Sequence, residues 1–164
     1  MAFPNIPELL TAKEYWHPIV SHFPLSMWLS ATVIFMISLL PRMQWLYLPS
    51  LVVGMVGTAL GWLAYKTGHI AQTTAGVEFL DVSKIAAHKE QAEITLVFFG
   101  ATFVMASLLL LIKNYVVKSF VQPTWLKLIL AVGLMLGCSY LTLTTHKGLQ
   151  LAFDQPQPTE IKTR

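Results

Sequence analysis

The chain has 164 residues, of which 55% are hydrophobic and only 12% are charged, and its mean hydropathy is +0.60. A typical soluble domain carries about 25% charged residues, so this composition predicts an integral membrane protein. The net charge of +3 is small, and no basic stripe or nucleic-acid motif accompanies it, which excludes a nucleic-acid partner.

Four apolar segments are long enough to cross a bilayer, which takes about 20 mostly apolar residues. Pro24 suits the first turn of the first segment, where its missing N–H costs nothing. Short connections join the first segment to the second and the third to the fourth, as between antiparallel neighbours. We therefore expect an all-α fold, an integral membrane four-helix transmembrane bundle that forms a single membrane domain over residues 1–164. The four spans cover residues 24–40, 46–65, 93–112 and 126–145.

Two other segments have a polar composition. The central connection is longer than the other two, and we expect a short interfacial helix in it at residues 76–87. The C-terminal segment 154–164 is polar and rich in proline, so we expect a flexible tail there.

All five histidines of the chain fall beside the ends of the four spans. His17 and His22 precede the first span, His69 follows the second, His88 precedes the third and His146 follows the fourth. Because the chain returns to the same membrane face after every second crossing, all five lie on one side of the bilayer. Imidazoles gathered in this way can bind a metal or a haem iron, for which neutral imidazole is a usual axial ligand.

The order of the spans sorts these histidines into pairs. In an up-down bundle the first and third spans are diagonal neighbours, so His22 and His88 are the expected axial ligands of haem b. His69 and His146 form the other diagonal and would ligate a second haem or cap propionates. The sequence thus predicts one or two haem b groups, with His17 as a further candidate ligand.

Other residues near the histidine end bear on this site. The glycines of the second and fourth spans are explained most simply by close helix packing, and Gly61 has the further interpretation that it makes room for a flat macrocycle. Lys66, Lys89 and Lys147 would pair with propionates or reach the interface as snorkelling lysines. The single cysteine, Cys138, can form no thiolate cluster, and the lack of a CxxCH motif excludes covalent c-type haem attachment.

A family resemblance rests on the segment HPIVSHFP at residues 17–24 and on His88, which precedes the third span. An HP-x-x-x-HFP start followed by such a histidine resembles a family of small four-helix bacterial membrane proteins described as a domain of unknown function. The resemblance covers residues 15–152. It implies similarity to b-type cytochrome subunits, some joined to c-type cytochrome domains, and it carries over best to His17, His22 and His88.

The expected function follows from the histidines and from this resemblance. We expect an electron-transfer subunit of a redox complex in a bacterial inner membrane, which exchanges electrons with a c-type cytochrome, another redox subunit or a quinone. Electron transfer needs no catalytic acid or base, so the chain is not expected to be an enzyme by itself. Two alternatives stay open. One is a structural or assembly subunit without a cofactor. The other is a copper or zinc site in which His17 and His22 join His88 or His146.

The basic residues give two conflicting indications of orientation. The loops opposite the histidines, with the adjoining span ends, carry Arg42, Lys113, Lys118 and Lys127 and no acidic residue. The total count of lysine and arginine is higher at the histidine end and favours a cytoplasmic position for it. The purely basic short loops favour the opposite, and we therefore expect the histidine end in the periplasm.

Overall fold

The computed structural model describes residues 16–74, 82–112 and 124–153. Within these residues it confirms the all-α fold, because four long helices and one short 3-10 helix account for the regular structure. All four long helices are long and apolar enough to cross a membrane, so the chain is a multi-pass membrane protein. The elements are α2 (Trp16–Ser38), η2 (Gln44–Leu46), α3 (Tyr47–Thr74), α4 (Val82–Leu111) and α5 (Thr124–Phe153).

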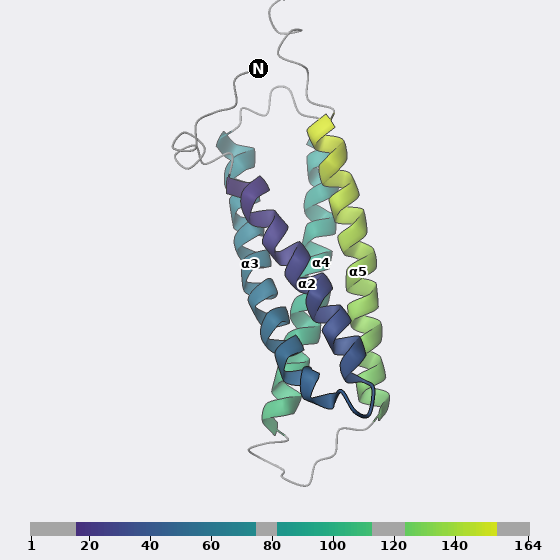
Figure 1. Cartoon of the computed structure of the whole chain (residues 1–164). Coiled ribbons are helices and arrows are strands. Elements are labelled where there is room, and N and C mark those ends of the chain that lie inside the picture. The colour runs from purple at the N-terminus through teal and green to yellow at the C-terminus, as the bar shows by residue number, and fades with distance from the viewer. Residues whose placement is uncertain (1–15, 75–81, 113–123, 154–164) are drawn as a thin grey trace, which may run out of the picture.

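The helices form an elongated bundle in which the chain runs up and down (Figure 1). α2 packs chiefly against α3, and α4 chiefly against α5, so the bundle consists of two helical hairpins. α2 and α4 lie diagonally, and side chains of the two helices meet between them. The starts of α2 and α4 and the ends of α3 and α5 gather at one end of the bundle, which we call the histidine end.

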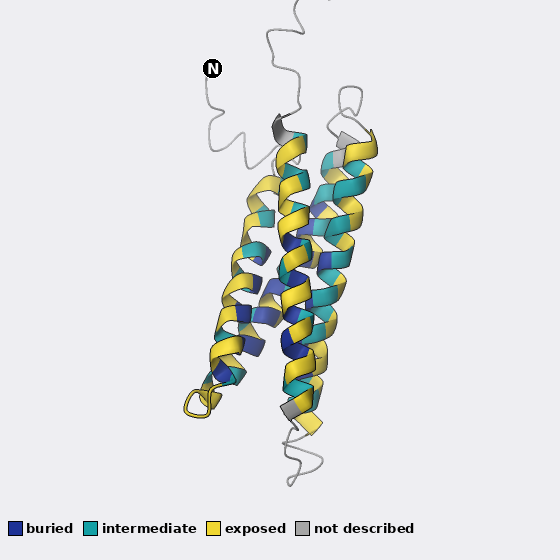
Figure 2. Cartoon of the chain, turned by 90° about the vertical axis from the view of Figure 1, so that its right-hand side faces the viewer, coloured by how far each residue is buried: buried dark blue, intermediate teal, exposed yellow. Residues whose placement is uncertain are grey.

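Burial follows the helix faces that point into the bundle. Figure 2 shows buried residues along the inner faces of the helices and exposed residues along the outside. The outer face is apolar: Val33, Val97 and Val132 are 58%, 66% and 58% exposed. An apolar exterior on every long helix is what contact with lipid chains requires.

The two hairpins meet at an aromatic stack in the middle of the bundle. The rings of Trp28 on α2 and Phe99 on α4 are parallel to within 4°, with centroids 4.7 Å apart. Each ring lies over a glycine of its own hairpin. A Cβ atom added to Gly57 would come within 3.0 Å of Trp28, and one added to Gly137 within 3.1 Å of Phe99. These glycines therefore let the large rings fill the space between the diagonal helices.

The helices extend past the predicted spans at the histidine end. α2 begins at Trp16, so Pro18 takes the first-turn position expected for Pro24, and Pro24 lies inside the helix. α4 begins at Val82, so residues 82–87 of the expected interfacial helix are the first turns of α4. The rest of that segment lies outside the described residues, as does the expected flexible tail at 154–164. Hydropathy marks the membrane core and not the helix ends, which is why the helices are longer than the predicted spans.

Candidate functional site

All five histidines lie on the four long helices, near the histidine end. His17 and His22 are in the first two turns of α2, and His88 is in the second turn of α4. His69 and His146 lie within about two turns of the ends of α3 and α5. The gathering expected from the order of the spans is therefore present, although the histidines lie within the helices and not beside them.

His17 is fixed by two contacts with α3. Its Nδ1 lies 2.9 Å from the carbonyl oxygen of Ala64. The ring also lies against Gly68, where an added Cβ atom would come within 2.9 Å of the ring carbon Cε1. A side chain at position 68 would therefore push the imidazole away, so this glycine makes room for His17.

His88 is fixed in the same way by α5. Its Nδ1 lies 3.1 Å from the carbonyl oxygen of Thr144. A Cβ atom added to Gly148 would come within 3.0 Å of Cε1 of His88. Both histidines are half-buried, and each is held by a carbonyl and a glycine on the neighbouring helix of its own hairpin.

These hydrogen bonds determine which ring nitrogen can bind a metal. A carbonyl oxygen only accepts, so Nδ1 of each ring must carry the hydrogen and donate it. In a neutral imidazole the lone pair then lies on Nε2. A backbone carbonyl on Nδ1 is a usual arrangement behind metal-ligating histidines, because it fixes the tautomer and the ring orientation.

The two imidazoles also lie at a distance that suits a shared metal atom. The centroids of the His17 and His88 rings are 6.4 Å apart, and the ring planes make an angle of 77°. A metal atom bound between two imidazoles at about 2 Å from each nitrogen holds the ring centroids roughly 6 Å apart. His17 and His88 come from the diagonal helices α2 and α4, so they approach such an atom from opposite sides.

The two halves of this site repeat the same spacing. The stacked aromatic follows the histidine by eleven residues in both hairpins (17 to 28 and 88 to 99). The glycine next to the histidine follows the accepting carbonyl by four residues (64 to 68 and 144 to 148). The glycine under the aromatic precedes that carbonyl by seven residues in both (57 to 64 and 137 to 144). The hairpins are thus an internal structural repeat, and each supplies one imidazole.

The structure brings His88 together with His17 and not with His22, the partner expected from the sequence. An α-helix turns by about 100° per residue, so five residues put His22 about 140° around α2 from His17. The two side chains cannot both point into the bundle, and the side chain of His22 is exposed.

The other expected pair consists of two exposed side chains. His69 and His146 both lie on the outside of the bundle end. Nε2 of His146 lies 3.1 Å from the amide nitrogen of Gln150, one turn further along α5. Within the described residues, the inward-facing imidazoles are those of His17 and His88.

Gly61 lies against an aromatic ring. A Cβ atom added there would come within 2.5 Å of the Trp28 ring, so the indole occupies the space in front of this glycine. The structure thus shows Trp28 in front of Gly61, and the interpretation that this glycine makes room for a macrocycle stays a prediction. The glycines beside the histidines are Gly68 and Gly148. The sign of this in the sequence was that both glycines follow the second and the fourth span at the histidine end.

One buried polar atom beside the pair has no partner. It is Oε1 of Gln91, the only such side-chain atom among the described residues. Gln91 follows His88 by three residues and so lies on the same face of α4. One turn further on, the hydroxyls of Thr95 and Thr144 lie 2.9 Å apart. A buried unpaired acceptor marks a place where a further group or water is needed.

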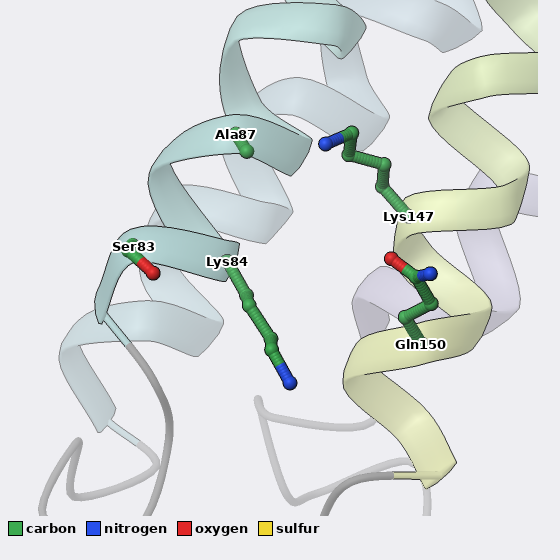
Figure 3. Close-up of a pocket in the computed structure, with 5 residues that line it drawn as sticks. All are labelled: Ser83, Lys84, Ala87, Lys147 and Gln150. Atoms are coloured by element: carbon green, nitrogen blue, oxygen red, sulfur yellow. The ribbon is translucent and has the colours of Figure 1, made fainter.

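The lysines expected to pair with propionates are engaged differently. Lys66 lies over the ring of Trp62, and Lys89 is 4.0 Å from the carboxylate of Glu93. Lys147 instead lines a pocket of about 170 Å³ between α4 and α5, together with Lys84. Figure 3 shows Lys147 extending from α5 toward Ala87 of α4. This pocket lies at the histidine end, and two lysines line it, although their amino groups point in different directions (Figure 3).

The chemistry of the site is that of a two-ligand set. No group of three His, Cys, Asp or Glu side chains that could hold a metal ion occurs within residues 16–74, 82–112 and 124–153. Two imidazoles on opposite sides are the set that supplies both axial ligands of a haem iron. Comparison with protein-family models, with curated proteins and with solved structures finds no match for this chain.

Proposed function

We propose that the bundle binds one haem b between its two hairpins, with His17 and His88 as axial ligands, and serves as a membrane electron-transfer subunit. The observation that carries this proposal is the paired geometry of the two imidazoles. Each is inward-facing, each keeps a lone pair on Nε2, and the two come from diagonal helices at a suitable separation.

The residues around the pair fit this group. The carbonyls of Ala64 and Thr144 hold the imidazoles in the ligating tautomer and make them better ligands. Gly68 and Gly148 leave room for the rings. Lys84 and Lys147 supply positive charge for propionate groups at the same end. When bound, haem supplies a one-electron Fe(III)/Fe(II) couple, and these side chains set its place and surroundings.

The place of the site indicates how such a subunit would work. The imidazoles lie near one end of the bundle, so electrons would be exchanged at that membrane surface with a c-type cytochrome or another redox partner. The purely basic short loops at the opposite end favour the periplasm for the histidine end. The resemblance of the HPIVSHFP segment to bacterial membrane proteins supports a bacterial inner membrane.

A visible spectrum of the purified protein tests this proposal. Protein produced with an adequate haem supply should be coloured, and its reduced-minus-oxidised spectrum should show the sharp bands of a bis-histidine haem. Pyridine extraction should yield haem b at about one group per chain. A colourless protein from cells that load another b-type cytochrome correctly would refute the haem proposal and favour a structural or assembly subunit.

The glycines beside the histidines provide a second prediction. In Gly68→Ala the new Cβ atom meets the imidazole of His17 at 2.9 Å, a contact that real Cβ atoms essentially never show. In Gly148→Ala it meets the imidazole of His88 at 3.0 Å, which is tighter than nine in ten real Cβ contacts. The ring must therefore move, and we expect haem content to fall roughly 10- to 100-fold, as for other losses of support behind a ligand.

The matched control for these variants is Gly100→Ala. Its Cβ atom would meet only Cγ2 of Thr58 at 3.4 Å, an ordinary contact. Haem content per chain, measured by pyridine extraction, should stay at the wild-type value in this variant. Equal haem content in all three variants would contradict the role given to Gly68 and Gly148.

A further inference from the structure

A groove between α2 and α5 lies on the lipid-facing side of the bundle at the histidine end. Its volume is about 370 Å³, within the usual range of small-molecule sites. Leu25 and Leu29 of α2 line one wall, and Leu141 and Leu149 line the other. Three polar side chains of α5, Thr142, Thr145 and His146, lie among these leucines.

The groove between α2 and α5 has an equivalent place in the other half of the internal repeat, and that place is closed. The groove is therefore not a general property of the fold. The corresponding junction between α3 and α4 is bridged by a hydrogen bond of 2.6 Å from the Tyr65 hydroxyl to Glu93. In the repeat, Thr145 corresponds to Tyr65, because each directly follows the accepting carbonyl (64 to 65 and 144 to 145). His22 corresponds to Glu93, because each follows the inward-facing histidine by five residues (17 to 22 and 88 to 93). The shorter threonine cannot bridge in this way.

The polar atoms in the groove supply both donors and acceptors. The amide nitrogen of Gln150 can only donate, so Nε2 of His146 accepts from it and Nδ1 carries the hydrogen. The hydroxyls of Thr142 and Thr145 donate to the carbonyls of Cys138 and Leu141 in their own helix. Their oxygens therefore remain as acceptors, while His146 offers an N–H donor.

We propose that this groove binds the head group of a membrane quinone, with His146 donating to a quinone carbonyl and the threonine oxygens accepting from the reduced form. A quinone combines a flat apolar ring, two carbonyl oxygens and an apolar tail, which matches leucine walls open to lipid with a few polar atoms between them. Among the three polar side chains, His146 is the ionisable one, and an ionisable side chain on a membrane helix indicates a functional site.

The groove adjoins the histidine pair through α5. Thr144, whose carbonyl fixes His88, is the direct chain neighbour of Thr145 in the groove. One side of α5 thus supports the imidazole while the other lines the quinone site. This assignment rests on the proposed electron-transfer function, for which the quinone would be the membrane-soluble partner.

Quinone binding to the purified full-length chain tests this assignment. Decylubiquinone and a menaquinone with two isoprene units are each titrated in detergent micelles, and bound quinone is quantified by ultrafiltration and extraction. We expect saturable binding of one quinone per chain by at least one of them. His146→Leu should weaken it roughly five- to tenfold, as for one lost hydrogen bond, and Leu29→Trp should weaken it more by filling the groove. His69→Leu, at the same end on α3, should leave it unchanged.

The alternatives give different results. Binding that does not saturate, that is equal in all variants, or that is absent for both quinones would overturn the assignment. Displacement of both quinones by an equimolar anionic phospholipid would also overturn it and identify a lipid site. The double variant His17→Ala, His88→Ala keeps the two proposals distinguishable, because quinone binding there is measured without the proposed haem ligands. A colourless wild-type protein that still binds quinone in this groove would refute only the haem proposal.

Discussion

Replacing either His17 or His88 by alanine is expected to abolish the sharp reduced-minus-oxidised bands and to lower haem content at least a hundredfold. Loss of a group behind a ligand already costs about 10- to 100-fold in metal affinity, and these variants remove the ligand itself. One remaining imidazole would leave the iron with an open axial position, which broadens and shifts the spectrum. Absorbance spectra and pyridine extraction of the purified variants measure both effects.

The matched control is His22→Ala, on the same helix five residues from His17. Its side chain is exposed and points about 140° away from the pair, so bands and haem content should match the wild type. Circular dichroism should show full helicity in all three variants, since His17 and His88 lie near helix ends. Unchanged bands in both His17→Ala and His88→Ala would end the ligand assignment, and loss of the bands in His22→Ala alone would restore the pair expected from the sequence.

The all-α membrane fold was predictable because hydropathy measures how apolar a segment is, and a segment must be apolar to be stable among lipid chains. Four apolar segments of sufficient length leave few other architectures, since every backbone polar group in a membrane must be satisfied within the chain. The gathering of the histidines followed from the same count of crossings. Both results depend only on the order and the length of the spans, and neither requires knowledge of how a helix is rotated about its axis.

The proposed ligand pair depends on that rotation, which the order and the length of the spans do not give. Between His17 and His22 the choice is decided by which face of α2 packs against α3. That face is set deep in the bundle, where Trp28 lies over Gly57 and Gly61. Since Trp28 points inward, His17, eleven residues or about three turns earlier, points inward as well.

The internal repeat was equally hidden in the sequence. Its equivalent positions hold chemically different residues: Trp28 matches Phe99, and Ala64 matches Thr144. The accepting groups are backbone carbonyls, which any residue supplies, so no side-chain motif marks them. Among the positions that build the site, the histidines and the glycines are identical, and each histidine is separated from the glycine that it contacts by 51 residues in one hairpin and by 60 in the other (17 to 68 and 88 to 148). Contacts in space connect them, and the linear pattern does not.

The stack between the hairpins gives the prediction with the largest effect on stability. Phe99 is fully buried, stacks on Trp28 and lies over Gly137. Because lipid chains are as apolar as a protein core, Phe99→Ala loses little transfer free energy on folding within the membrane, and packing dominates. Removing ~100 Å³ at about 24 cal/mol per Å³ of cavity predicts a loss of roughly 2–3 kcal/mol in the free energy of unfolding.

Unfolding of the protein in mixed micelles with increasing dodecyl sulfate, followed by circular dichroism, measures this loss. The control is Val97→Ala on the same helix, where the side chain is 66% exposed toward lipid and its removal opens no cavity, so the change should stay within about 0.5 kcal/mol. Trp28→Ala and the double variant complete a cycle. Because the two rings stack on each other across the hairpin junction, the double variant should lose less than the two single losses combined, by about 0.5–1.5 kcal/mol. If the loss in the double variant equalled the sum of the two single losses, each ring would stabilise only its own hairpin. Other contacts would then have to hold the two hairpins together.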